Sequence, residues 1–157
     1  MLSVTPYVLY EDVASAVDWL THAFGFHETV RYSDDKGVSF SELEFGAERL
    51  MVARFAEGFR NPKDMGYVSG QIYLTVDDVD AHYAQAKASG AHIISELEDK
   101  AYGLRMYIAD DPQGQRWTVA EQVRDVMPEE WGGVTVRLGK PDRRLMAVAD
   151  DRHAGAG

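Results

Sequence analysis

The chain lacks cysteine, long apolar runs and an excess of positive charge, and each absence excludes a class of protein. Without cysteine there are no disulfides, no thiolate metal ligands and no cysteine nucleophile. No stretch is apolar for long enough to cross a bilayer as a helix, so we expect no membrane partner. The 16 basic and 26 acidic residues give a net charge of −10. Because nucleic-acid binding needs a basic surface, we expect no nucleic-acid partner either.

The length of the chain and its first residues indicate the number of domains and the location to expect. A length of 157 residues is enough for one domain with a proper core. The first fifteen residues contain two acids and no Lys or Arg, which is not typical of a signal peptide, so we expect a cytoplasmic location. The acidic surface would attract cationic ligands and repel anionic ones, although it also serves solubility.

An internal repeat is the most informative feature that is present. Residues 5–13 lead from a strand-like run into a helix-like run that ends near residue 25. Residues 71–79 begin the same pattern, which ends near residue 90. The copies are offset by 66 residues at the start and 65 at the end. The repeat predicts two copies of one supersecondary unit, with a concave surface between them.

Each copy reads as a strand, a capped helix and three more strands. Asp12 and Asp78 are suited to cap the helices, because a carboxylate can accept hydrogen bonds from the free amides of the first turn. Apolar residues recur at helical spacing after each cap, and Gly25 and Gly90 end the helices. The strand-like runs that follow are residues 28–32, 38–45 and 49–55 and residues 92–97, 103–109 and 115–121.

The sequence therefore predicts a single domain over residues 1–122. Its first module spans residues 3–56 and its second spans residues 70–122. Residues 123–157 form a C-terminal extension, which we expect to be a flexible tail or an arm that packs on a dimer partner. Within the extension, residues 134–138 alternate in polarity and could add a strand.

Two short signatures accompany the repeat. Residues 111–117 read Asp-Pro-Gln-Gly-Gln-Arg-Trp, and the helices end in Ala-Phe-Gly-Phe and Ala-Ser-Gly-Ala. With these features the chain resembles the vicinal oxygen chelate superfamily, which includes glyoxalase I, extradiol dioxygenases and bleomycin-resistance proteins. The resemblance implies an α+β fold in which two βαβββ modules form a curved mixed sheet around a cleft, with the helices on the outer face. It also implies a homodimer whose cleft borrows residues from the second subunit.

The resemblance further implies where a metal would be held. Catalytic members of the superfamily bind a divalent ion with four side chains, and the corresponding positions here carry Thr5, Met51, Gln71 and Thr118. Only Gln71 is a plausible ligand, because a thioether is too soft and threonine hydroxyls coordinate poorly. No pair among the five histidines has metal-ligand spacing. We therefore expect no metal, no other cofactor and no catalytic residue.

A cleft with an apolar, aromatic lining should remain. Successive strand side chains face opposite sides, so Tyr7 and Tyr73 face the cleft if Thr5 and Gln71 do. Tyrosine offers a flat face for stacking and a hydroxyl for orientation, although either tyrosine could instead fill the core. The predicted ligand-binding residues are Thr5, Tyr7, Met51, Phe55, Gln71, Tyr73, Tyr102, Arg116 and Thr118.

These patterns favour a metal-free small-molecule binding protein that sequesters an aromatic or cationic natural product, such as an antibiotic. The alternative is an enzyme, either a glyoxalase-like lyase or isomerase or a dioxygenase. It would use a metal held by Gln71 and unforeseen residues, or an acid/base pair such as Glu42 or Glu44 with Tyr7. A third interpretation is an interaction protein whose working surface lies beyond Trp131.

Overall fold

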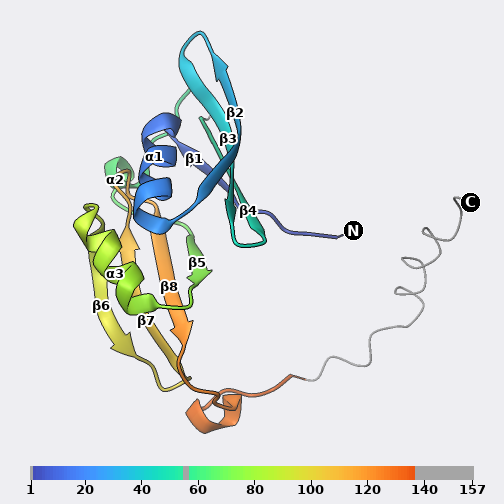
Figure 1. Cartoon of the computed structure of the whole chain (residues 1–157), viewed down its shortest axis with the longest axis vertical. Helices are drawn as coiled ribbons and strands as arrows, with labels where there is room; N and C mark the ends of the chain where they lie inside the picture. The colour runs from blue at the N-terminus through green and yellow to red at the C-terminus, as the bar shows by residue number, and fades with distance from the viewer. Residues whose placement is uncertain (1, 55–56, 137–157) are drawn as a thin grey trace, which may run out of the picture.

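The protein has the predicted α+β fold, with two four-stranded sheets and one main helix against each (Figure 1). The structure is a computed structural model that describes residues 2–54 and 57–136. The two sheets follow one another in the chain and repeat the same order of elements. The repeat read from the sequence is therefore a repeat of structure.

The first module contributes the sheet with strand order β1-β4-β3-β2, in which β1 and β4 are parallel and the other pairs are antiparallel. Its elements are β1 (Tyr7–Tyr10), α1 (Val13–Phe24), β2 (His27–Asp34), β3 (Gly37–Phe45) and β4 (Glu48–Arg54).

The second module forms the matching sheet, with strand order β5-β8-β7-β6 and the same pairing pattern. Its elements are β5 (Gln71–Thr75), α3 (Val79–Ala88), β6 (His92–Asp99), β7 (Leu104–Asp110) and β8 (Arg116–Gln122). A short helix α2 (Pro62–Met65) lies in the connection between the modules, and a 3-10 turn η1 (Pro128–Trp131) follows β8.

The predicted helix caps are confirmed in both modules. The Asp12 carboxylate accepts a hydrogen bond from the Ser15 amide at 3.0 Å, and Asp78 accepts one from the Ala81 amide at 2.8 Å. Each cap satisfies one of the amides that the first helical turn leaves unpaired. Helix α1 ends at Gly25, as the sequence predicts.

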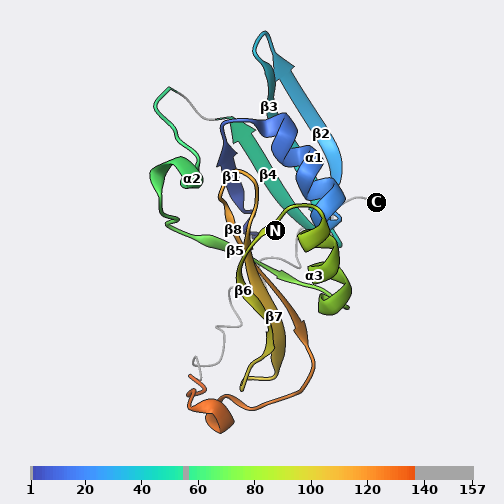
Figure 2. The same cartoon turned by 90° about the vertical axis from the view of Figure 1, so that its left-hand side faces the viewer.

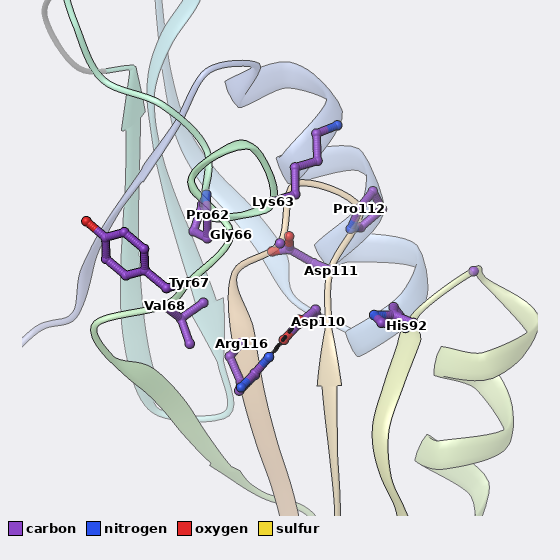
Figure 3. Close-up of a pocket in the computed structure, with 12 residues that line it drawn as sticks. Pro62, Lys63, Gly66, Tyr67, Val68, His92, Asp110, Asp111, Pro112 and Arg116 are labelled. Atoms are coloured by element: carbon purple, nitrogen blue, oxygen red, sulfur yellow. Dashed lines mark hydrogen bonds and ion pairs between the residues drawn. The ribbon is translucent and has the colours of Figure 1, made fainter.

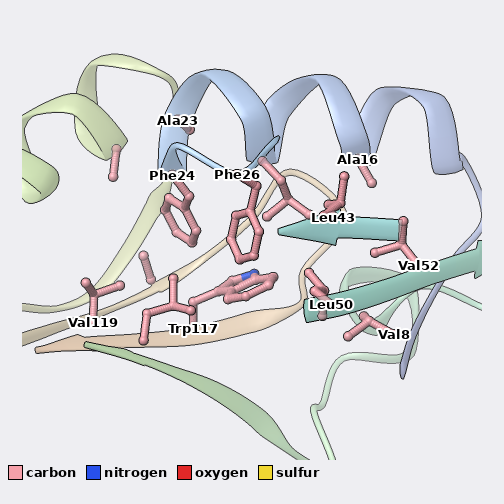
Figure 4. Packing of buried hydrophobic residues seen from close by; sticks show 14 of the residues in the cluster. Val8, Ala16, Ala23, Phe24, Phe26, Leu43, Leu50, Val52, Trp117 and Val119 are labelled. Atoms are coloured by element: carbon pink, nitrogen blue, oxygen red, sulfur yellow. The ribbon is translucent and has the colours of Figure 1, made fainter. Parts of the chain in front are cut away.

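The hydrophobic core is shared between the two modules (Figure 4). Helices α1 and α3 lie side by side (Figure 2), and the Trp117 ring of β8 packs beneath the end of α1. Phe24 meets Trp117 edge-on, with ring centroids 5.4 Å apart, and Phe26 lies 5.9 Å away. Because Trp117 is completely buried and its ring meets rings of the other module, it helps to hold the two sheets in one arrangement.

A buried polar cluster joins the modules beside this core. Asp111 accepts hydrogen bonds from the Tyr10 hydroxyl at 2.7 Å and the Trp117 indole N–H at 3.2 Å. Its other carboxylate oxygen accepts from the Gln113 and Gln115 amides. Burial raises the pKa of Asp111, and burial next to Asp111 also raises the pKa of Tyr10. The 111–117 signature thus fastens the second module to the first strand of the first.

The C-terminal extension departs from the sequence prediction in its first part. Residues 123–136 include the η1 turn, and residues 134–136 form no strand, contrary to the strand expected at 134–138. Residues 137 and 138, like the remainder of the predicted tail, lie outside the described residues.

Candidate functional site

Each sheet has one face against its helix and an opposite face that carries a prominent tyrosine. Tyr7 is the register partner of Met51, and Tyr73 is the register partner of Thr118. Tyr7 is 56% exposed and Tyr73 is 51% exposed, so neither fills the core. Their neighbours in β1 and β5, Val8 and Leu74, are buried on the helix side.

The open face of the first module continues across β4, β3 and β2. Met51 is opposite Glu42, and Glu42 is opposite Val30. Arg49 contacts the Glu42 carboxylate at 3.4 Å. Val30 and the neighbouring Tyr32, which are 48% and 64% exposed, also lie on this face and were not among the predicted site residues. Their spacing of two within β2 is the signal that could have placed them on this face.

The open face of the second module is packed at its centre. The Thr118 hydroxyl donates to the Gln71 side-chain carbonyl at 3.1 Å, and Thr118 is only 2% exposed. The Tyr102 hydroxyl donates to the Met106 sulfur at 3.3 Å. Burial, together with the nearby Tyr102, raises the pKa of Tyr73. On this face the central Thr118 is therefore buried, whereas the rings of Tyr73 and Tyr102 are exposed.

The predicted site residues line three hollows rather than one. Tyr7 and Gln71 line a hollow of about 320 Å³ between β1 and β5. Tyr73 lines a mostly apolar hollow of about 650 Å³ between the modules, with Val4 and Arg49 across from it. Thr5, Met51, Tyr102 and Thr118 line none of these three hollows. The expected cleft is thus divided within a single chain.

Arg116 belongs to the third hollow, of about 640 Å³, which opens beside the connection between the modules (Figure 3). Its guanidinium donates two hydrogen bonds to the Asp110 carboxylate, at 2.8 and 3.0 Å. This pairing raises the pKa of Arg116. The positive charge of Arg116 is paired with the negative charge of Asp110. The pair therefore offers little net positive charge to a ligand in the hollow.

Of two further aromatic residues near the predicted site, Phe55 was predicted to bind ligand and Tyr107 was not. Phe55, predicted to bind ligand, lies outside the described residues. Tyr107, which neighbours the predicted site in sequence, faces α3, where its hydroxyl lies 2.7 Å from His82 Nδ1. It is fully buried, so it is a core residue.

The four positions that the resemblance assigns to a metal do not fit a divalent ion. The Gln71 carbonyl oxygen already accepts the Thr118 hydrogen bond, and Met51 offers only a thioether. Among residues 2–54 and 57–136, no group of three or more His, Asp or Glu side chains is placed to hold a metal.

The order of elements and the paired open faces define a two-module βαβββ protein. Residues 4–119 match the model of the Glyoxalase/Bleomycin resistance protein/Dioxygenase superfamily, so the chain belongs to this superfamily. An uncharacterized protein of Mycobacterium bovis is 31% identical over 134 residues, which cover 82% of this chain and 88% of that protein.

Solved structures agree with this assignment. TioX from Micromonospora sp. ML1 is 31% identical, with a TM-score of 0.65, and the match covers 78% of this chain and 99% of TioX. A gene product of Arabidopsis thaliana is 26% identical, with a TM-score of 0.60, and the match covers 77% of this chain and 98% of that one. In the part of the chain that the structure describes, no helix is long and apolar enough to span a membrane.

Proposed function

We propose that the protein is a metal-free small-molecule binding protein that sequesters a flat aromatic or cationic natural product, such as an antibiotic. The observation that carries the proposal is the pair of open sheet faces, each with a half-exposed tyrosine beside positions unsuited to a metal. Binding alone lowers the free concentration of the compound, so protection needs no bond to be broken.

The chemistry of the faces supports a flat and partly apolar ligand. Tyr7 and Tyr73 present ring faces for stacking, and Met51 adds a polarizable side chain at half-buried depth. Gln71, which is exposed, supplies a side-chain amide that can orient a ligand's polar atoms. A net charge of −10 favours a cationic ligand over an anionic one.

A homodimer would complete the site. In one chain Tyr7 and Tyr32 of the first module and Tyr73 of the second are all at least half exposed. A second copy laid against these faces would enclose a ligand between rings of both chains. Superfamily membership and the superfamily name, which includes bleomycin resistance, support this arrangement and the class of ligand.

Titration of the purified chain with a panel of cationic and aromatic compounds tests the proposal. We expect one class of planar compound to bind in a stoichiometric ratio and to be recovered chemically unchanged. Turnover of any compound, together with the lack of a stoichiometric binder in the panel, would contradict sequestration.

A metal-free acid/base enzyme is the second candidate, because Tyr7 and Glu42 are both register partners of Met51 on one face. A hydroxyl and a carboxylate on either side of a ligand could move a proton. Arg49 contacts the Glu42 carboxylate at 3.4 Å, which helps to hold this side chain on the face. Glu42→Gln separates the two functions, since it would abolish turnover but leave binding within about threefold.

A further inference from the structure

The C-terminal extension places a tryptophan against the open face of the second module. The Trp131 ring meets the Tyr102 ring edge-on, with centroids 5.8 Å apart and an interplanar angle of 68°. Tyr102 in turn donates to Met106, which lies on the same face of the sheet as Thr118 and Tyr73. Rings of Tyr73, Tyr102 and Trp131 therefore gather at one end of this face.

Backbone hydrogen bonds hold the chain after β8 against the β6–β7 turn, upstream of this tryptophan. The Val123 and Arg124 amides both donate to the Gly103 carbonyl, at 3.0 and 3.1 Å. Gly103 has a positive φ of 86°, and a Cβ added there would lie 2.2 Å from the Arg124 carbonyl oxygen. Only glycine allows both the turn and the close approach of the extension.

The turn that carries Trp131 is equally constrained. The Glu130 carboxylate accepts from the Met127 amide at 2.7 Å, and the Gly133 amide donates to the Pro128 carbonyl at 2.7 Å. A Cβ at Gly133 would lie 2.7 Å from the Trp131 ring, so glycine lets the ring lie flat over the backbone. The ring is held in place and still 46% exposed.

Acidic residues predominate in the turn that carries this ring, and the neighbouring Arg124 guanidinium donates to the Ala101 carbonyl. Residues 125–131 include three acids and no Lys or Arg. Hydrogen bonds from its own amide and from Thr135 lower the pKa of Glu129, so it stays anionic at neutral pH. Tryptophan is the aromatic side chain that attracts cations most strongly, and an acidic surround adds to that attraction.

We propose that Trp131 and Tyr102 form one wall of the ligand site, supplied by the C-terminal extension, and that this wall binds a planar aromatic cation. The inference rests on the proposed function and specifies its ligand class. Trp131 lies beyond residues 4–119, which match the superfamily, so this half of the wall is an addition to the common fold.

Calorimetric titration of the full chain with two planar probes tests the inference. Proflavine is a planar tricyclic cation, and anthracene carboxylate is a tricyclic anion of similar outline. We expect proflavine to bind the wild-type chain at least about tenfold more tightly than anthracene carboxylate. Equal affinity, or preference for the anion, would overturn the assigned ligand class.

Substitutions then assign the wall. Trp131→Ala should weaken proflavine binding about tenfold, because one stacking ring is lost, and Trp131→Phe should weaken it less than about threefold. Val134→Ala is the matched control in the same extension, since Val134 is 80% exposed, and it should leave affinity unchanged. The thermal midpoint of Trp131→Ala shows whether the fold is intact.

Acrylamide quenching of tryptophan fluorescence provides an independent readout. Trp117 is fully buried and Trp19 is half-buried, so Trp131 should be the tryptophan most open to quencher. Proflavine should protect the part of the quenching that Trp131→Phe removes. If Trp131→Ala binds proflavine as tightly as the wild type, the wall is wrong and the proposed function stands. If the wild type binds no planar compound at all, both are wrong.

Discussion

The two modules share one topology but contribute differently to the molecule. Helix α1 buries six of its 12 residues, whereas α3 buries two of its ten. The face of α3 is instead joined to its sheet by polar contacts, such as the ion pair from Arg105 to Asp80. The first module therefore provides most of the helical core, and the second provides most of the buried polar groups and carries the extension.

The comparison teaches that a repeated fold need not repeat its functional surface. A Cβ added at Gly37 in the β2–β3 turn would meet no atom within 4 Å, whereas one added at Gly103 in the equivalent β6–β7 turn would meet the extension. Tyr32 near the first turn is exposed to solvent, while Tyr102 near the second contacts Trp131. Four predictions, ordered by expected effect, test this division between the modules.

Trp117→Ala should have the largest effect. It empties the space where the rings of both modules meet, and we expect a loss of about 3–5 kcal/mol in the free energy of unfolding. Denaturant unfolding measures it, and Trp131→Ala, which removes an exposed ring, should cost less than about 1 kcal/mol. A small loss for Trp117→Ala would mean that the modules do not share one core.

Asp111→Asn should follow, with a loss of about 2–3 kcal/mol. In the variant an NH2 group replaces one carboxylate oxygen. Its hydrogens would face two groups that are themselves hydrogen-bond donors, either Tyr10 and Trp117 or the two backbone N–H groups. Asp110→Asn is the matched control, and it should cost less than about 1 kcal/mol because its pair with Arg116 is partly solvated. If denaturant unfolding gave equal losses of unfolding free energy for both variants, Asp111 would have no special role in joining the two modules.

Gly103→Ala and Gly37→Ala compare the two equivalent turns directly. Both glycines have positive φ and share the cost of a left-handed alanine, which is about 1 kcal/mol. Only Gly103→Ala also pushes on the Arg124 carbonyl, so it should destabilise by about 1–2 kcal/mol more. It should also expose Trp131 to acrylamide. Identical behaviour of both variants would show that the extension is not fastened at this turn.

The pH dependence of stability should show the smallest effect. Burial lowers the pKa of His82 below its ordinary value of 6.5, so the unfolded chain binds a proton where the folded chain does not. Stability should therefore fall as the pH drops from 7 to below 6. His82→Gln should flatten this slope, and His22→Gln on the exposed side of α1 should not. Denaturant midpoints measured across this range decide the matter.

Local signals in the sequence predicted much of the fold. The repeat, the caps at Asp12 and Asp78, and the orientations of Tyr7 and Tyr73 all follow from interactions within a few residues or from the alternation of a strand. The orientation of Tyr107 could not be predicted in this way. Strand β7 carries apolar residues on both faces, so alternation alone does not show which face of the sheet each side chain occupies.

The division of the site into three hollows could not be predicted from local patterns. It depends on how the modules pack, which is decided by contacts far apart in the chain, such as Phe24 with Trp117. The wall of Trp131 depends on Gly103, which is 28 residues earlier, and glycine in the sequence indicated only a turn there. Long-range packing of this kind leaves little trace in a single sequence.

The central claim is that ligand binding needs no metal, and calorimetry on chelator-treated protein tests it most directly. The wild-type chain is dialysed against EDTA and titrated with proflavine, first without metal and then with added zinc or nickel. We expect a stoichiometric complex with the same dissociation constant in each titration. Binding that appears only after a divalent metal is restored would contradict the account.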